Sequence, residues 1–424
     1  MNIASQSASP ASGKNPSSVV GGNWIVCQLG ARERYAIPRA LQRRGLLREL
    51  ITDFWFPQGG FRPPLLAKKM DPRWNDELAE ATIKSFNGYF LAFELMGRLG
   101  GRSEWDLMIA RNHAFQRHAA KRLMSLPSGG AVGGQDTIVF SYSYSALEQF
   151  REAKRKGWRT VLGQIDLGPM ENELEKHLLG EHPEWHCSTL SSPPTSYWQE
   201  WREECELADT IIVNSEWARE GMLHQGIPRE KIVVIPLAYQ VEKAECLRPK
   251  AKGINSDFTQ KQPLRVLFLG QVVARKGIYD LIAAARMLEG EDVIIDVVGA
   301  HRPLPELLPS NLRFHGAVSL SETLAWYRAA DLFVLPTHSD GFAITQLEAM
   351  SHGLPVITTP RCGSVVEDGW NGCLFQQGDA VALADLLRRL SSDRDLLHAM
   401  SLRAKETVGR FSVERLAENL SVLR

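Results

Sequence analysis

Short apolar runs alternate with amphipathic stretches along most of this 424-residue chain. In the first half, the apolar runs predict strands at residues 24–29, 137–141, 160–165, 210–214 and 231–235. Predicted helices follow at residues 32–44, 146–156 and 216–224, the last with Ser215 as its N-cap. Strands that alternate with helices form a mostly parallel sheet covered on both faces. The pattern therefore predicts an α/β fold of the doubly wound, Rossmann-like kind.

The same alternation begins again after a polar segment. Residues 242–263 are rich in Lys, Gly, Asn, Ser, Asp and Gln, and we interpret them as a linker. Beyond it, predicted strands lie at residues 264–269, 293–298, 332–335 and 355–358, and predicted helices at 278–288, 320–328 and 345–351. The chain is too long for one ordinary core, so two domains are expected. Their sheets would face each other across a cleft, where ligands bind.

The domain boundaries follow from this pattern. Residues 1–22 are rich in Ser, Ala, Pro and Gly and lack the apolar core of a signal peptide, which predicts a disordered tail. We expect the first Rossmann-like domain at residues 23–241, the second at residues 264–410, and a C-terminal segment at residues 411–424.

Composition excludes several classes of protein. The 49 basic and 49 acidic residues give a formal net charge of zero, which argues against nucleic acid as the main partner. The six cysteines are scattered without a Cys-x-x-Cys pair, as in a reduced cytoplasmic protein. No stretch reaches the roughly 18 apolar residues of a spanning helix. His177, His182 and His186 have spacings that fit no common zinc site, and Pro183 interrupts them, so we expect a loop or surface cluster here rather than a metal site.

Two carboxylates mark the most informative stretch. Asp340 and Glu348 follow the apolar run 331–336, with Gly341 between them. The pattern predicts a buried strand, a loop with one acid and a helix with the second acid. This arrangement places both acids and the amino end of a helix around one crevice, which can hold sugar hydroxyls and a phosphate together.

Arg275 and Lys276 lie between a predicted strand and a predicted helix. Two cations at a helix start oppose the helix dipole, which makes a purely structural role unfavourable. Together with free backbone N–H groups, they can stabilise a diphosphate that gains negative charge. We therefore interpret them as a phosphate-binding pair.

From residue 264 onward the chain resembles the group 1 glycosyltransferases, also called glycosyltransferase family 4, of the GT-B fold. Four blocks carry the resemblance: residues 269–277, 297–300, 313–318 and 330–372. Residues 208–215 and 231–236 also match, whereas earlier residues match weakly. The resemblance implies two Rossmann-like domains facing across a cleft, with residues 411–424 as a helix that crosses back to the first domain.

The resemblance also implies a role for each matched residue. Asp340 corresponds to the first acid of the family's E-x7-E pattern and would face the reacting sugar, and Glu348 corresponds to the second acid and would bind ribose hydroxyls. The implied catalytic residues are Asp340, Arg275, Lys276 and Asp166. The implied donor-binding residues are Gly30, Gly270, Gly299, Gly316, Ala317, Gly341, Phe342, Ala343, Ile344, Thr345 and Glu348.

The chain departs from the family pattern at three places. Gln271 stands where an arginine is common, and Asp340 stands where glutamate is common. The family often has a histidine at a strand end near the reacting sugar, but residues 161–169 contain none. Gln164 and Asp166 are the nearest polar residues there. Asp166 would orient the acceptor hydroxyl or take its proton, or it only begins a turn.

The expected function is retaining transfer of a sugar, of the hexosyltransferase type, without a required metal. The donor would be a nucleoside diphosphate sugar and the acceptor a hydroxyl of a glycan, a lipid-linked molecule or a small molecule. The alternative is a catalytically silent sugar-nucleotide binder or scaffold. A GT-B epimerase or phosphorylase is disfavoured, and so is a dehydrogenase, because no Gly-x-Gly-x-x-Gly follows the first strand. The sugar, the base and the acceptor are left open.

A basic, aromatic stretch at residues 43–74 has two interpretations. It would dock on an anionic bilayer near a lipid-linked acceptor, or it is an ordinary helix and loop. We therefore expect a cytoplasmic protein, with peripheral contact at the inner membrane surface as an option.

Overall fold

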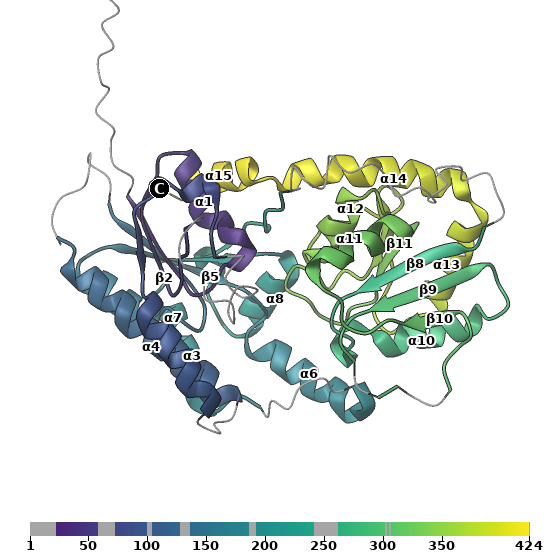
Figure 1. Cartoon of the computed structure of the whole chain (residues 1–424), viewed down its shortest axis with the longest axis horizontal. Helices are drawn as coiled ribbons and strands as arrows, with labels where there is room; N and C mark the ends of the chain where they lie inside the picture. Colours follow the sequence, from purple (N-terminus) through teal and green to yellow (C-terminus); the bar gives the residue numbers. More distant parts are fainter. Residues whose placement is uncertain are drawn as a thin grey trace, which may run out of the picture.

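Two parallel sheets organise the fold, one in each half of the chain (Figure 1). The structure is a computed structural model that describes residues 23–57, 73–99, 104–127, 136–185, 192–240, 262–301, 303–304 and 307–423. The predicted tail at residues 1–22 and nearly all of the predicted linker lie outside the described residues.

The first sheet has the strand order β3-β2-β1-β4-β5-β6-β7. Its strands are β1 (Trp24–Gln28), β2 (Leu47–Thr52), β3 (Ile83–Ser85), β4 (Ile138–Tyr142), β5 (Arg159–Gln164), β6 (Thr210–Val213) and β7 (Ile232–Val234). Its helices are α1 (Ala36–Arg43), α3 (Asn87–Leu99), α4 (Glu104–Ser125), α5 (Leu147–Arg155), α6 (Pro169–Glu181), α7 (Thr195–Leu207) and α8 (Glu216–His224). The direction of winding reverses between β1 and β4, so a crevice is expected at the carboxyl ends of these strands.

The second sheet has the order β10-β9-β8-β11-β12-β13. Its strands are β8 (Leu264–Leu269), β9 (Val293–Val298), β10 (Leu312–Phe314), β11 (Leu332–Leu335), β12 (Val356–Thr358) and β13 (Gly372–Leu374). Its helices are α10 (Ile278–Met287), α11 (Leu320–Ala329), α12 (Thr345–Ser351), α13 (Ala380–Ser392) and α14 (Arg394–Val408). Winding reverses between β8 and β11, which places the loops after these strands beside each other.

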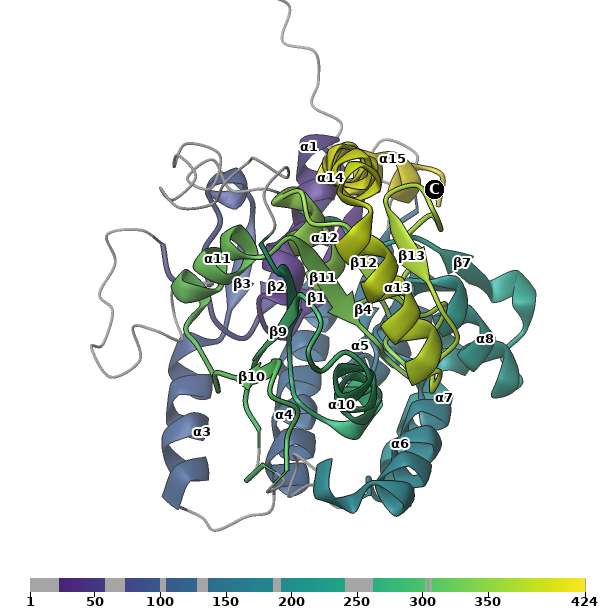
Figure 2. The ribbon, with the colours of Figure 1, turned by 90° about the vertical axis from the view of Figure 1, so that its right-hand side faces the viewer.

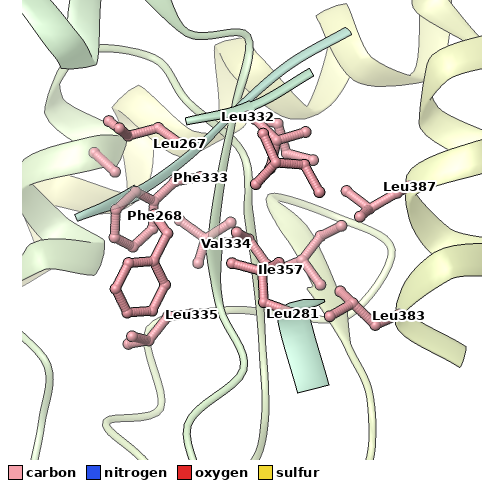
Figure 3. Packing of buried hydrophobic residues seen from close by; sticks show 14 of the residues in the cluster. Leu267, Phe268, Leu281, Leu332, Phe333, Val334, Leu335, Ile357, Leu383 and Leu387 are labelled. Atoms are coloured by element: carbon pink, nitrogen blue, oxygen red, sulfur yellow. The ribbon is translucent and has the colours of Figure 1, made fainter. Parts of the chain in front are cut away.

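Apolar strands of the second sheet are buried on both faces (Figure 3). Phe268 of β8 and Phe333 of β11 are fully buried. Leu281 of α10 and Leu383 of α13 cover the sheet in the same cluster. Burial of such side chains stabilises the fold by roughly 1.5–3 kcal/mol each. This core fixes the strand ends from which the site loops emerge.

The C-terminal helix returns to the first half, as expected. The helix α15 (Val413–Ser421) packs against α1, and its Leu416 and Leu420 are buried in the core of the first half. Figure 1 shows α14 and α15 running along one side of the molecule from the second half to the first.

The helix α6 connects the two halves on the opposite side. Figure 2 shows α14 and α15 on one side of the sheets and α6 on the other. Leu178 of α6 and Trp185, just beyond α6, are buried in the core of the second half. The helix therefore follows a strand of the first half but packs on the second.

The predicted helix at residues 32–44 is wrong at its start. Arg32–Tyr35 forms a 3-10 turn in which Glu33, Arg34 and Tyr35 have left-handed φ angles of 49, 50 and 63°. Left-handed residues cannot continue a right-handed helix, so α1 begins only at Ala36. Three such residues in succession store strain at the carboxyl end of the first sheet.

Candidate active site between the two sheets

Lys276 and Asp340 meet where the loops after β8 and β11 come together. The Nζ of Lys276 donates a hydrogen bond to Oδ2 of Asp340, and Oδ1 of Asp340 accepts one from the backbone N–H of Ala343 at 3.2 Å. Ala343 has a left-handed φ of 56°. The Asp340 carboxylate therefore holds both a cation and a strained turn at the start of α12.

Gly277 allows these two loops to approach closely. A Cβ on this residue would lie 1.8 Å from the carbonyl oxygen of Pro336, at a left-handed φ of 71°. No other residue fits without displacement of the backbone. The glycine of the Arg275-Lys276-Gly277 block is thus needed for packing against the β11 loop.

Arg275 is held by groups from both halves. Its Nη1 donates to the carbonyl oxygen of Ser339 at 2.7 Å and forms an ion pair with Oε1 of Glu171 at 2.8 Å. Its own carbonyl oxygen accepts from the backbone N–H of His338 at 2.8 Å and from Thr337 Oγ1 at 3.1 Å. The loop after β8 is therefore fixed along the loop after β11.

The environment of Lys276 disfavours its charge. Burial lowers the pKa of Lys276 to about 7, and the neighbouring Arg275 acts in the same direction. Glu171 acts in the opposite direction and favours the ammonium form. An incoming anion would favour that form further, because an opposite charge stabilises a buried cation.

Glu348 lies in the first turn of α12, where an acid complements the helix dipole. Its Oε2 accepts a hydrogen bond from the hydroxyl of Tyr327 at 2.8 Å. Tyr327 is buried, with its ring stacked on His352 at a centroid distance of 5.3 Å. The carboxylate is therefore oriented from behind by a rigid tyrosine.

Three predicted glycines lie together at the ends of β8, β9 and β10. The backbone N–H of Gly299 donates to the carbonyl oxygen of Gly316 at 2.8 Å, and a Cβ on Gly299 would lie 1.8 Å from the carbonyl oxygen of Gly270. The next residue after Gly316 is Ala317, and the preceding His315 bonds to Asp296 at 2.7 Å. Gly299 thus serves close backbone approach.

In the first half, Asp166 follows β5 and lies in a polar network. Its Oδ1 accepts from the hydroxyl of Tyr144 at 2.6 Å, from Gln164 Nε2 at 2.9 Å and from the backbone N–H of Gly168 at 2.9 Å. Burial and the nearby Glu171 together raise the pKa of Asp166 to about 6, whereas the hydrogen bonds from Tyr144 and Gly168 favour the carboxylate. The acid is thus poised to change its charge near neutral pH.

Tyr144 is a residue that the sequence pattern did not indicate. It has a left-handed φ of 69°, and its backbone N–H donates to Glu204 at 2.7 Å. The buried Glu204 also accepts from the backbone N–H of Ala146 at 2.7 Å at the start of α5. Glu204 thereby fixes the position from which the Tyr144 hydroxyl reaches Asp166.

The two halves touch directly at the Asp340 loop. A Cβ on Gly341 would lie 2.6 Å from the carbonyl oxygen of Ile165 and 3.0 Å from Asn214 Nδ2. Trp217 of α8 donates from Nε1 to Ser339 Oγ at 3.0 Å. The remaining loop residues continue into α12: Phe342, Ala343, Ile344 and Thr345. The structure therefore brings Asp166 and the Asp340 loop to one junction.

Gly30 lies in the loop that follows β1. Its backbone N–H donates to Oδ1 of Asp53 at 3.0 Å. The fully buried Asp53 also pairs with Arg73 at 2.7 Å and Arg111 at 2.9 Å. Its predicted approach to a ligand stays a prediction.

Sequence reasoning missed Glu171, Tyr144, Glu204 and Trp217. The helix α6, which was not predicted, begins with Pro169 and has Glu171 in its first turn. A proline at the first position and an acid in the first turn are typical of helix starts, so this signal could have revealed the helix. The contacts of these residues join different elements, so spacing along the chain gives no signal for them.

Within the described ranges, no group of three or more His, Cys, Asp and Glu side chains is arranged to hold a metal ion. His186 lies outside those ranges. No helix in the described part of the chain combines the length and the apolar character needed to cross a bilayer.

The family model described as "Glycosyl transferases group 1" matches residues 263–393. The D-inositol 3-phosphate glycosyltransferase of Geodermatophilus obscurus is 29% identical over 240 residues, covering 50% of this chain and 51% of the relative. The capsular polysaccharide biosynthesis glycosyltransferase CapM of Staphylococcus aureus is 25% identical over 235 residues, covering 50% of this chain and 60% of the relative. The chain thus spans 51% and 60% of the length of these two relatives, which is less than two thirds in both cases.

Solved structures resemble most of the chain. Sucrose-phosphate synthase from Thermosynechococcus elongatus has a TM-score of 0.60 at 17% identity and covers 95% of this chain and 98% of its own. HepE from Anabaena, solved with UDP, has a TM-score of 0.58 at 15% identity, covering 94% and 98%. These likenesses establish the GT-B fold. Over residues 263–393 the chain matches the group 1 glycosyltransferases, which confirms the resemblance predicted for its second half.

Proposed function

We propose that the chain is a retaining glycosyltransferase of the hexosyltransferase type. It would transfer a sugar from a nucleoside diphosphate sugar to a hydroxyl of a glycan, a lipid-linked molecule or a small molecule. The observation that carries this proposal is the Lys276–Asp340 contact beside Arg275, where a cationic pair and a carboxylate occupy the carboxyl ends of β8 and β11.

The cations have a direct role in this chemistry. When the glycosidic bond breaks, the diphosphate leaving group gains negative charge. Lys276 and Arg275 would stabilise that charge at a largely buried position, where electrostatic interactions are stronger than in water. Removal of one such donor often costs about 10² to 10³ in rate.

The carboxylates would orient the donor. Asp340 would accept hydrogen bonds from sugar hydroxyls or face the positive charge that develops at the anomeric carbon, once its lysine turns to the phosphate. Glu348, oriented by Tyr327, would bind the two ribose hydroxyls. Backbone N–H groups from Gly341 to Thr345 would contact the sugar and the phosphate.

On the acceptor side, Asp166 would orient the acceptor hydroxyl or accept its proton. Its pKa of about 6 keeps most of it ionised at neutral pH. Tyr144 and Gln164 would hold the carboxylate in place of the histidine that the family often has.

Structural relatives support a nucleotide sugar as the donor. The HepE structures contain UDP, UDP with glucose, and UDP-glucose, as bound by that protein. The proposal includes no metal, because two basic side chains would neutralise the diphosphate.

We also propose a cytoplasmic location with peripheral membrane contact as an option. Within the basic, aromatic stretch at residues 43–74, Trp55 is buried, and residues 58–72 lie outside the described residues. Tyr89, Leu95 and Met96 of α3 are more exposed, at 42, 56 and 65%. Sedimentation with anionic vesicles would test such contact.

A thermal-shift screen tests the donor site. UDP-, GDP- and ADP-sugars are added in turn, because a bound donor raises the melting temperature by mass action. One base class should raise it in the wild type, and much less in Glu348→Ala. Absence of a shift with every donor would count against the proposal. A shift without any turnover would support the silent binder instead.

A further inference from the structure

Glu171, from the first half, forms an ion pair with Arg275, whose guanidinium is expected to bind the donor. Glu171, in the first turn of α6, has Oε1 2.8 Å from Nη1 of Arg275. Its Oε2 accepts from the backbone N–H of Leu167 at 3.3 Å. Both side chains of the ion pair are largely buried, with 15% and 18% exposed.

The chemistry of this pair resembles that of a bound phosphate. A guanidinium binds carboxylate and phosphate oxygens with the same N–H groups and similar geometry. Nη1 of Arg275 already donates to the carbonyl oxygen of Ser339 at 2.7 Å. Glu171 therefore occupies the position on Arg275 that a diphosphate oxygen would take.

The helix that carries Glu171 is anchored to the second half. Leu178 and Trp185 are buried there, with 3% and 5% exposed. His182, just after α6, stacks on the ring of Tyr279 of α10 at a centroid distance of 3.7 Å. Withdrawal of α6 would expose these side chains, so Glu171 stays close to Arg275 whether or not a donor is bound.

We propose that Glu171 is an internal competitor for the donor diphosphate, which rests on the proposed function of this site. Donor binding exchanges one anion for another on Arg275, and the flexible guanidinium turns while α6 stays in place. After transfer, the ion pair between Glu171 and the Arg275 guanidinium forms again, which favours release of the nucleoside diphosphate. Glu171 is thus a residue of the donor site contributed by the first half of the chain.

The size of the effect on nucleotide affinity depends on how often the Glu171–Arg275 ion pair is closed. When a site is available for only a fraction of the time, the apparent affinity falls by that fraction. An ion pair that is closed for roughly 70–90% of the time weakens apparent binding by about threefold to tenfold.

Titration calorimetry with UDP, GDP and ADP tests the proposal. The pH is set well below the pKa of Lys276, so that this lysine stays protonated when the charge of Glu171 is removed. The variants are Glu171→Gln, which keeps the size of the side chain and removes its charge, and Glu171→Asp, which shortens the reach. Glu173→Gln is the matched control, because Glu173 is exposed on the same helix. Glu171→Gln should bind the preferred nucleotide about threefold to tenfold more tightly than the wild type, Glu171→Asp should also bind more tightly, and the control should be unchanged.

The outcomes separate this proposal from the proposed function. Weaker or equal binding in Glu171→Gln, with normal binding in the wild type, overturns the competitor role alone. No binding of any nucleotide by any folded variant overturns both. Melting curves of each variant confirm that the fold is kept, and the Asp variant decides the matter if the Gln variant does not fold.

Discussion

Lys276 donates a hydrogen bond to Asp340, which joins two loops whose residues are 64 positions apart in the chain. The pair puts the cation expected at the phosphates directly beside the carboxylate expected at the sugar. Each side chain is largely buried, with 16% and 17% exposed. In the absence of donor, the two groups thus satisfy each other.

Replacement of Lys276 by alanine should abolish most transfer while the protein stays folded. The ammonium is the group best placed to neutralise the leaving diphosphate, so kcat should fall by about 10² to 10³. Lys176→Ala is a suitable control, because Lys176 is exposed on α6. Steady-state rates and a melting curve are measured for both variants. Full activity in Lys276→Ala would show that Lys276 does not neutralise the leaving diphosphate.

Replacement of Glu348 by glutamine should weaken donor binding. A hydrogen bond to a charged group is worth roughly 1.5–3 kcal/mol, so the KM for the donor should rise by about tenfold to a hundredfold. Tyr327→Phe removes only the hydroxyl that orients the carboxylate, and it should raise KM by less. A KM that is unchanged in Glu348→Gln contradicts the ribose-binding role. The alanine variant should abolish transfer.

The rate should depend on pH through two groups. Asp166 must be ionised, so kcat/KM should fall as pH falls below its raised pKa of about 6. Lys276 must be protonated, so kcat/KM should fall again as pH rises above its lowered pKa of about 7. The profile should be a narrow bell, and Asp166→Asn should remove its acid limb. An unchanged acid limb in that variant would assign the limb to another group.

Replacement of Gly341 by alanine should impair activity without unfolding. The added methyl group would lie 2.6 Å from the carbonyl oxygen of Ile165, so the Asp340 loop and the first half must move apart. Misplacement of catalytic groups by a fraction of an ångström to one ångström can cost up to about a hundredfold in rate. Gly180→Ala meets no atom within 4 Å and is the control. Equal rates in the two variants would show that activity does not depend on close contact between the Asp340 loop and the first half.

The sequence predicts the strands that are continuous apolar runs, because burial on both faces requires them. It does not predict β2, where Arg48 and Glu49 interrupt the run. Glu49 is nevertheless buried, because Arg122 of α4 pairs with it at 2.8 Å. The ion pair with Arg122, from a helix distant in sequence, thus permits the charged Glu49 within the buried strand. No local sequence pattern indicates this pairing.

In the candidate site too, the sequence could place some residues and not others. Lys276 and Asp340 could be placed together from the sequence, since each lies in the loop after an apolar strand of one sheet. Glu171 and Tyr144 could not, because their contacts depend on how α6 crosses to the second half and on a left-handed backbone angle at Tyr144. Such features arise from tertiary packing and leave no spacing to recognise.

We propose that this chain breaks the bond between the sugar and the nucleoside diphosphate, with Lys276 at the leaving group. The most direct measurement is release of free nucleoside diphosphate from UDP-, GDP- and ADP-sugars, with the anomeric configuration of the transferred or hydrolysed sugar followed by NMR. We predict release from one donor class, with retention of configuration, and loss of that release in Lys276→Ala. Equal release by the wild type and Lys276→Ala, or none from any donor by the folded wild type, would contradict the claim.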